Sequence, residues 1–360
     1  SWTPTAAQTL DIIQCDGICN AGTFTTINGP FGFNIGQSIV SGTPDLFRFT
    51  LAGNTIFIWD GDSDADGDGF SWNDPLNWTA DSGLPTSTDD VIIDDPGIGA
   101  ITVVVNSAGL TARQLSMPGI DNLSITSGDL TLNGTSSITT NLSLSGGVLQ
   151  GDGDITLTGT FNWAGGTIST SNSFLGSPTL NISGSGTRIL DGPTLTFNNA
   201  NFSGGSLEVK SGTFNATGTT TVSSSTSFST TGGTFNLATL NVNSASILSI
   251  PAGTISPSGL TTISGAASID ASGGIFTPTT LTLNNGTLTG SSNVTISGLL
   301  TWNDGDMLGT GTTFTNGGID FGGGSGSRTV DRNLINSGTN SWNLTGSIDG
   351  TGTLTHQSGT

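Results

Sequence analysis

Positive charge is scarce in this chain. Its 360 residues include six lysines and arginines against 26 aspartates and glutamates, so the formal net charge is −20 at pH 7. Binding to nucleic acid or to an anionic membrane surface requires clustered lysines and arginines, so we expect neither partner. The sequence also has no run of about eighteen apolar residues, which is the length that a membrane-spanning helix needs. We therefore expect no insertion into a membrane.

Several other residue types are almost absent. Tyrosine is missing, and histidine, lysine and glutamate occur once each, at His356, Lys210 and Glu208. With a single histidine, a serine–histidine–aspartate catalytic centre has little support. Helix-forming residues are scarce, whereas glycine, with 56 residues, and small polar and β-branched residues are abundant. This composition predicts an all-β protein.

The chain has two cysteines, Cys15 and Cys19, in the sequence C-D-G-I-C. No other cysteine or histidine lies nearby, which argues against a zinc site. We predict a disulfide that closes this short loop, with two free thiols as the alternative. The sequence opens SWTPTAAQTL, without an initiator methionine or an apolar signal core. Together these features predict a mature protein secreted to the extracellular space or cell surface, although a segment of a longer chain would begin in the same way.

Short strand-like runs dominate the sequence from about residue 99 onward. In each run an apolar–x–apolar pattern places two side chains on one face of a strand. The pairs are Leu130/Leu132, Leu142/Leu144, Ile155/Leu157, Leu180/Ile182, Leu195/Phe197, Leu207/Val209, Leu281/Leu283 and Val294/Ile296. Glycine-containing turns, such as SGGVL at Gly146 and Gly147, separate the runs, and glycine supplies the positive φ that tight corners need.

These turns recur at intervals of roughly 20 residues, which with three short strands per interval is the length of one β-solenoid coil. Successive coils stack about 4.8 Å apart, so about thirteen coils would form a rod on the order of 60 Å long. We predict a right-handed parallel β-solenoid (β-helix) over residues 99–360, with apolar side chains inside and Thr, Ser and Asn outside. A string of β-sandwich domains would need a period of about 90–100 residues, which the sequence does not show.

Two segments precede the repeats. Residues 1–58 alternate like strands between Gly-Pro and Gly-Asn turns, which predicts a small N-terminal β segment able to dock on another subunit by strand addition. Residues 59–98 hold an acidic stretch, DGDSDADGDGFSWND, and we expect them to cap the solenoid. Trp59, Trp72 and Trp78 flank this stretch. We favour a small aromatic core that seals the end of the solenoid over a face that stacks on sugars.

The acidic stretch has the pattern of a calcium-binding loop. It contains D-x-D-x-D-G ending at Gly67, and in such loops the three aspartates supply side-chain oxygens while glycine allows a sharp turn. Asp68 would supply its carbonyl at the seventh position, and Asn73 and Asp74 stand where a bidentate glutamate is usual. We predict that Ca²⁺ offsets the charge repulsion in this loop, with a hydrated acidic turn as the alternative. The predicted ligands are Asp62, Asp64, Asp66, Asp68, Asn73 and Asp74.

Carboxylate pairs elsewhere raise the alternative of a polysaccharide-active β-helix enzyme, either a lyase or a glycoside hydrolase. Hydrolysis needs two carboxylates about 5–10 Å apart. The candidate pairs lie in glycine-rich turns, which favours solvated turn acids; they are Asp152 with Asp154 and Asp304 with Asp306. A lyase would also need a basic residue near its substrate, and the arginines of the repeats have no acidic cluster beside them in sequence: Arg113, Arg188, Arg328 and Arg332. We predict no catalytic residues.

Residues 71–78 (SWNDPLNW) and 84–94 (LPTSTDDVIID), followed by G-x-L-x-L repeats, resemble large secreted bacterial repeat proteins. These include the β-helical passengers of autotransporters and filamentous-haemagglutinin-like adhesins. The resemblance covers residues 59–360 and implies a surface adhesin or a structural scaffold.

We predict a calcium-stabilised extracellular rod, either an adhesin stalk or the subunit of a secreted filament. The final residues, THQSGT, show no polar cap for the last coil, and open strand edges pair with other chains. We therefore expect self-association, head to tail, into a fibre or surface assembly. A cell-surface glycan is a further candidate partner.

Overall fold

A computed structural model of the chain describes residues 9–15, 33–40, 45–61, 67–79, 81, 83–94, 99–171, 173–176, 178–322, 326–343 and 345–357, with side chains from Asn54 onward. These residues form two sheets, one of three strands and one of 37. The only helical element in these ranges is a 3-10 turn, η1 (Pro75–Asn77). The predicted all-β class is therefore confirmed.

The small sheet is antiparallel and has the strand order β1–β3–β2. Its strands are β1 (Thr9–Cys15), β2 (Phe33–Val40) and β3 (Asp45–Gly53). This sheet is the predicted N-terminal β segment. The predicted disulfide lies outside the described residues, because only the backbone of Cys15 is described and Cys19 is not.

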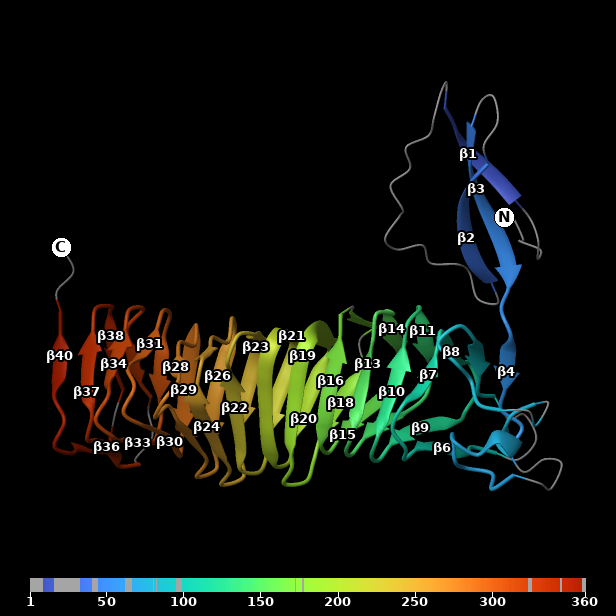
Figure 1. Cartoon of the computed structure of the whole chain (residues 1–360). Helices are drawn as coiled ribbons and strands as arrows, with labels where there is room; N and C mark the ends of the chain where they lie inside the picture. Colours follow the sequence, from blue (N-terminus) through green and yellow to red (C-terminus); the bar gives the residue numbers. More distant parts are fainter. Residues whose placement is uncertain are drawn as a thin grey trace.

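In the large sheet most strands pair in parallel with the strand three places later in the chain, as β10 (Asp129–Leu132) does with β13 (Val148–Gly151). Each coil therefore contributes one strand to each of three faces, and about 13 coils stack into a rod (Figure 1). The predicted parallel β-solenoid is confirmed; its right-handed winding stays a prediction.

We number the faces in the order in which the chain meets them after residue 99. Face 1 consists of β6 (Thr102–Val105), β9 (Asn122–Ile125), β12 (Leu142–Leu144), β15 (Thr160–Trp163), β18 (Thr179–Ile182), β20 (Asn199–Phe202), β26 (Leu260–Ser264), β29 (Thr280–Asn284), β32 (Leu300–Trp302), β35 (Ile319–Phe321) and β38 (Asn340–Trp342).

Face 2 consists of β7 (Leu110–Ala112), β10, β13, β16 (Gly166–Thr170), β22 (Thr226–Thr230), β24 (Ile247–Ala252), β27 (Ser268–Asp270), β30 (Gly286–Thr289), β33 (Gly305–Met307), β36 (Arg328–Val330) and β39 (Ile348–Asp349).

Face 3 consists of β4 (Ile56–Ile58), β5 (Asp90–Ile92), β8 (Gln114–Met117), β11 (Ser136–Ile138), β14 (Ile155–Leu157), β17 (Phe174–Leu175), β25 (Thr254–Ile255), β28 (Ile275–Phe276), β31 (Val294–Ile296), β34 (Thr312–Thr315), β37 (Asn333–Asn336) and β40 (Leu354–His356). Three long strands run around corners and belong to more than one face: β19 (Thr187–Phe197), β21 (Gly205–Val222) and β23 (Thr234–Val242).

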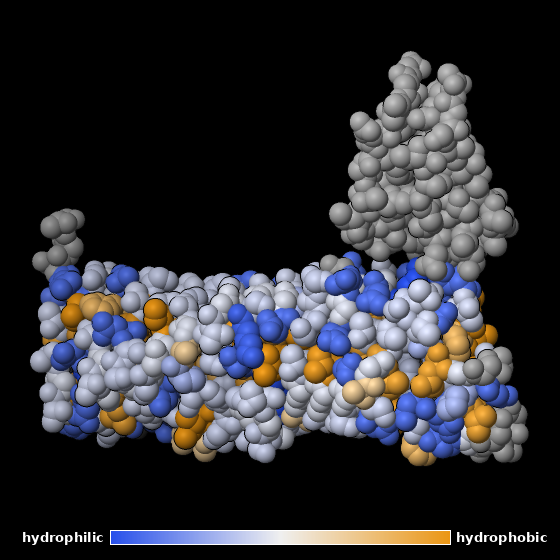
Figure 2. Space-filling view, in the orientation of Figure 1, coloured by the Kyte–Doolittle hydropathy of each residue, from blue (hydrophilic) through white to orange (hydrophobic). Residues whose placement is uncertain are grey.

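The core runs along the inside of the rod and is built from the predicted inward residues. Every side chain of the eight apolar pairs identified in the sequence is at most 1% exposed. Equivalent residues stack across coils, so that Leu130 lies between Leu110 and Leu149. Burying each such leucine contributes about 1.5–3 kcal/mol. The outer surface is mostly polar, with apolar residues scattered along the face seen in Figure 2.

The corner between face 1 and face 2 requires glycine. Gly147 has a φ of +69°, in the left-handed region, and a Cβ there would lie 2.1 Å from the carbonyl oxygen of Gly128 in the preceding coil. Both the backbone conformation and the close approach of the two coils therefore exclude a side chain. This agrees with the predicted role of the Gly-Gly turns.

The two ends of the solenoid differ. At the N-terminal end, β4 pairs with β5 on face 3, and Ser71 forms a parallel bridge with Val104 of β6 on face 1. At the other end, the coil formed by β38, β39 and β40 leaves Trp342 and Leu354 exposed, at 59% and 46%. Residues 56–61 and 67–78 thus cover part of the first coil, whereas the inward side of the last described coil is open.

Candidate functional site

Three tryptophans pack together at the covered end of the solenoid. Trp59, Trp72 and Trp78 are at most 2% exposed, and the rings of Trp59 and Trp72 contact that of Trp78 edge to face, with centroids 4.9 and 5.0 Å away. Trp78 Nε1 donates to the Trp72 carbonyl at 2.9 Å. The enclosed rings do not form a surface for stacking on sugars. The predicted aromatic core is confirmed.

The described part of the acidic stretch is organised around Asp68 and Asn77. Asp68 Oδ1 accepts hydrogen bonds from the amides of Phe70 and Ser71, at 3.0 and 2.7 Å, and from Asn77 Nδ2 at 2.7 Å. Partial burial would raise the pKa of Asp68, but hydrogen bonds from Ser71, Asn77 and Phe70 lower it to about 2. Asp68 therefore holds this turn as a carboxylate.

Asn77 is the residue that sequence reasoning missed. Its side chain is fully buried, donates to the Ser71 carbonyl at 2.9 Å and accepts from the Gly69 amide at 2.9 Å. A Cβ on Gly67 would lie 2.1 Å from Asn77 Oδ1, so glycine is needed there to let the loop approach Asn77. The only sequence signal was a polar residue between two apolar ones in SWNDPLNW.

The six predicted calcium ligands divide into two groups. Three lie outside the described residues: Asp62, Asp64 and Asp66. Among the other three, Asp74 accepts from the amides of Asp68 and Leu76, both at 3.1 Å, and caps η1. Asn73 Oδ1 is buried and has no hydrogen-bond partner. Within the described residues, no group of three or more His, Cys, Asp or Glu side chains is placed to hold a metal ion.

Three of the four candidate catalytic carboxylates accept hydrogen bonds that build the solenoid. Asp152 Oδ1 accepts from Ser171 Oγ at 2.5 Å, and Asp154 Oδ1 accepts from the Ser173 amide at 3.0 Å. Asp304 Oδ1 accepts from the adjacent Gly305 amide at 2.7 Å. These contacts join a coil to the next or close a turn, which is a structural use of the carboxylates.

The four arginines of the repeats are all buried, at no more than 8% exposure. Arg113 forms a two-point ion pair with Asp90, with Nε–Oδ1 and Nη2–Oδ2 distances of 2.7 and 2.6 Å. The side chains of Arg188 and Arg328 donate to backbone carbonyls, including Trp163 and Trp302 at 3.1 and 3.0 Å. Burial lowers the pKa of both guanidinium groups. These arginines therefore do not present a basic surface to an anionic substrate.

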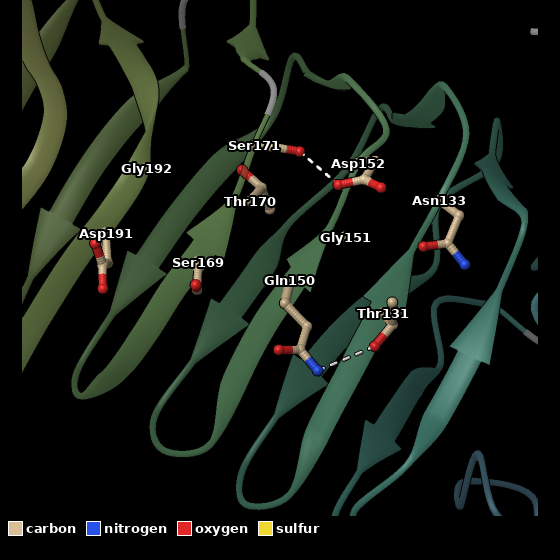
Figure 3. Close-up of a pocket in the computed structure, with 10 residues that line it drawn as sticks. All are labelled: Thr131, Asn133, Gln150, Gly151, Asp152, Ser169, Thr170, Ser171, Asp191 and Gly192. Carbon is tan, nitrogen blue, oxygen red and sulfur yellow. Dashed lines mark hydrogen bonds between the residues drawn. The ribbon is translucent and has the colours of Figure 1, made fainter. Parts of the chain in front are cut away.

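A groove of 480 Å³ crosses four coils on face 2 (Figure 3). Its lining includes hydroxyl, amide and carboxylate side chains and two glycines; the lining residues are Thr131, Asn133, Gln150, Gly151, Asp152, Ser169, Thr170, Ser171, Asp191 and Gly192. A second hollow of 390 Å³ on face 3, around Asn215 and Asn236, has no charged lining residue. Of these two hollows, the face 2 groove is the one lined by carboxylates, those of Asp152 and Asp191.

Comparison with known proteins gives no match, whether with protein-family models, curated proteins or solved structures. The resemblance to secreted bacterial repeat proteins is supported as far as the β-solenoid fold. In the described part of the chain, no helix has the length and hydrophobicity needed to cross a membrane.

Proposed function

We propose that this protein is an extracellular structural rod without catalytic activity, either the stalk of a surface adhesin or the subunit of a secreted filament. The β-solenoid fold supports a structural role in general. The observation that carries the finer proposal is the open coil formed by β38, β39 and β40. In this proposal the coil is the contact surface for a second copy of the chain.

In the open coil, apolar side chains occupy the inward positions, as they do in the coils before it. The ring of Trp342 contacts that of Phe321 at a tilt of 47°, with centroids 4.4 Å apart, yet Trp342 remains 59% exposed. Leu354 lies in register with Leu334, which is fully buried, yet Leu354 is 46% exposed. Another β layer would remove both side chains from water and pair the open strand edges, and full burial of one such side chain contributes about 1.5–3 kcal/mol.

The covered end of the solenoid restricts how a second copy can dock. There β4 already adds a strand to face 3, and Ser71 bridges to face 1, so a first coil does not stack directly on a last coil. The small sheet offers another route, because β1 and β2 form its edges in the order β1–β3–β2. We propose that one of these edges adds to the open coil of a neighbouring copy.

Substitution of Leu354 tests the end-to-end contact. In sedimentation velocity and negative-stain microscopy with calcium, wild-type rods should lengthen as concentration rises. Leu354→Ser should need at least tenfold more protein to reach the same length. Leu260→Ser is the matched control, because Leu260 is 45% exposed but points outward from face 1. Monodisperse short rods at high wild-type concentration, or equal association of both variants, would contradict the proposal.

We further propose that Ca²⁺ stabilises the acidic stretch. The support is Asn73 Oδ1, a buried oxygen that has no hydrogen-bond donor, because calcium takes oxygen ligands of this kind. Asp68 and Asp74 already accept backbone amides, so their carboxylates shape the loop. The remaining oxygens would come from the side chains of Asp62, Asp64 and Asp66.

Thermal unfolding with and without calcium tests the ion. For a dissociation constant of about 1 mM, typical of extracellular modules, 10 mM Ca²⁺ should stabilise the fold by about 1.4 kcal/mol. Asp64→Asn should remove this gain, whereas the exposed Asp349→Asn should retain it. A melting temperature that neither calcium nor chelator changes would show that the loop is only a hydrated turn.

A further inference from the structure

The groove on face 2 has two parallel walls that run along the rod. One wall is formed by outward residues in register across successive strands, with Thr131 opposite Gln150 and Gln150 opposite Ser169. The other wall follows two residues later in each coil and contains Asp152 and Ser171 (Figure 3). Because strands of successive coils are about 4.8 Å apart, a groove over four coils is about 14 Å long.

Two glycines lie on the floor of the groove. Gly151 and Gly192 lie between the two walls with φ values of +124° and +122°. A Cβ at these positions would lie 2.1 Å from the Leu132 carbonyl oxygen and 2.5 Å from the Thr170 carbonyl oxygen. The backbone geometry therefore excludes side chains at Gly151 and Gly192, whereas the equivalent floor position of the coil between them holds Thr170, whose side chain is buried.

The wall side chains are held in place by contacts between coils. Gln150 Nε2 donates to Thr131 Oγ1 at 3.1 Å, and Ser171 Oγ donates to Asp152 Oδ1 at 2.5 Å. Asp191 Oδ1 accepts from a serine of the next coil at 2.7 Å. Groups that are already ordered lose little conformational freedom when they bind a ligand.

We propose that this groove binds an uncharged oligosaccharide lying along the rod axis. A carboxylate accepts hydrogen bonds from hydroxyl groups, whereas amides and hydroxyls both donate and accept, so the lining suits a chain of hydroxyl groups. The two carboxylates have no basic residue beside them in the lining, and the chain carries a net charge of −20, so anionic glycans are repelled.

A metal ion fits the groove less well than a sugar chain does. Asp191 lies on β19 and Asp152 directly follows β13, so two coil spacings, about 10 Å, separate them along the rod. No third acidic, histidine or cysteine side chain joins them in the lining. The lining also lacks an aromatic ring, so sugar binding should be weak, with a dissociation constant of about 1 mM.

The test is titration of the full chain with linear trisaccharides, followed by NMR or calorimetry. The probes are uncharged trimers of glucose, mannose, galactose and xylose, with trigalacturonate as the anionic comparison. At least one uncharged trimer should bind. Ser169→Phe, which fills the groove from an exposed position, should weaken binding at least tenfold, as should Asp191→Asn. Ser249→Phe is the control, because Ser249 is on face 2 outside the groove.

Three results would overturn the inference. The first is that no uncharged trimer binds at a concentration tenfold above the expected dissociation constant of about 1 mM. The second is that wild type and Ser169→Phe bind the trimers equally well. The third is that trigalacturonate binds as tightly as the uncharged trimers or more tightly. If sugar binding is not found, the proposal of end-to-end association is unaffected, because Ser169 and Leu354 lie on different coils and association is measured without sugar.

Discussion

Arg188→Met tests how the solenoid holds a widened corner. Val148 pairs with Thr167 on face 2, but the next coil pairs Gly166 with Arg188, so that coil is three residues longer than its predecessor. The Arg188 side chain is fully buried beneath this longer turn and donates to six backbone carbonyls. The guanidinium group thus joins the longer turn, through the Gly186 carbonyl, to the coils before and after it, through the carbonyls of Ala164 and Gly204.

The expected loss of stability follows from the backbone carbonyls that would lose their hydrogen-bond donor. The carbonyls of Trp163 and Gly204 are bonded at 3.1 and 3.3 Å in buried contacts, whereas the other four contacts are partly exposed. Water can replace the donor at exposed carbonyls but not at buried ones, and an unsatisfied buried carbonyl costs about 1–3 kcal/mol. Removing the charge also removes its desolvation cost. We expect Arg188→Met to lower the free energy of unfolding by about 2–4 kcal/mol.

The assay is urea unfolding together with hydrogen exchange of peptides from residues 160–207. Because neighbouring coils mainly contact each other, the loss of protection should centre on that segment. Lys210→Met is the control, since Lys210 is exposed, and it should change the free energy of unfolding by less than about 0.5 kcal/mol. If Arg188→Met is as stable as Lys210→Met and its exchange is unchanged, the guanidinium group does not support the corner.

Three further substitutions test other parts of the rod. Gly147→Ala should cost at least about 2 kcal/mol in urea unfolding, because its φ is +69° and the new Cβ would meet the Gly128 carbonyl. Asp68→Asn should cost about 1 kcal/mol at pH 7, a value reduced for the exposure of Asp68. Because the folded pKa is about 2 rather than 3.8, this stabilisation is present above about pH 4 and is lost as the pH falls toward 2, where the melting temperatures of variant and wild type should converge. Leu334→Ala should cost about 2–5 kcal/mol, measured by the same urea unfolding, since its side chain is fully buried.

The strand pattern was readable because a solenoid coil is a local unit. Alternation of apolar and polar residues defines which side chains face inward, and the period defines the coil, so both could be read without knowing any distant contact. Parallel stacking can override this signal. Phe314 is the apolar residue of its strand, yet Thr313 and Thr315 point inward in register with Val294 and Ile296.

The contacts at the corners and in the cap could not be predicted from the sequence in the same way. Arg188 and Arg328 bind carbonyls more than twenty residues away in the chain, and a backbone carbonyl carries no residue-type signature. Asn77 holds Asp68 through a turn whose shape depends on Gly67. The groove on face 2 likewise brings together residues from four coils, so finding it requires knowing how the coils are aligned.

The buried arginines also affect how rods interact sideways. Four of the five arginines of the chain lie inside the solenoid, so among the described side chains Lys210 is the exposed basic residue. The flanks of two parallel rods would then meet acid against acid, without cations to pair across the gap. Lateral bundling should be opposed by this repulsion and restored by high salt, because ions screen exposed charges beyond about 10 Å at 0.1 M. Hiding the positive charge thus keeps the flanks of the rod uniformly acidic, which gives it colloidal stability along its length.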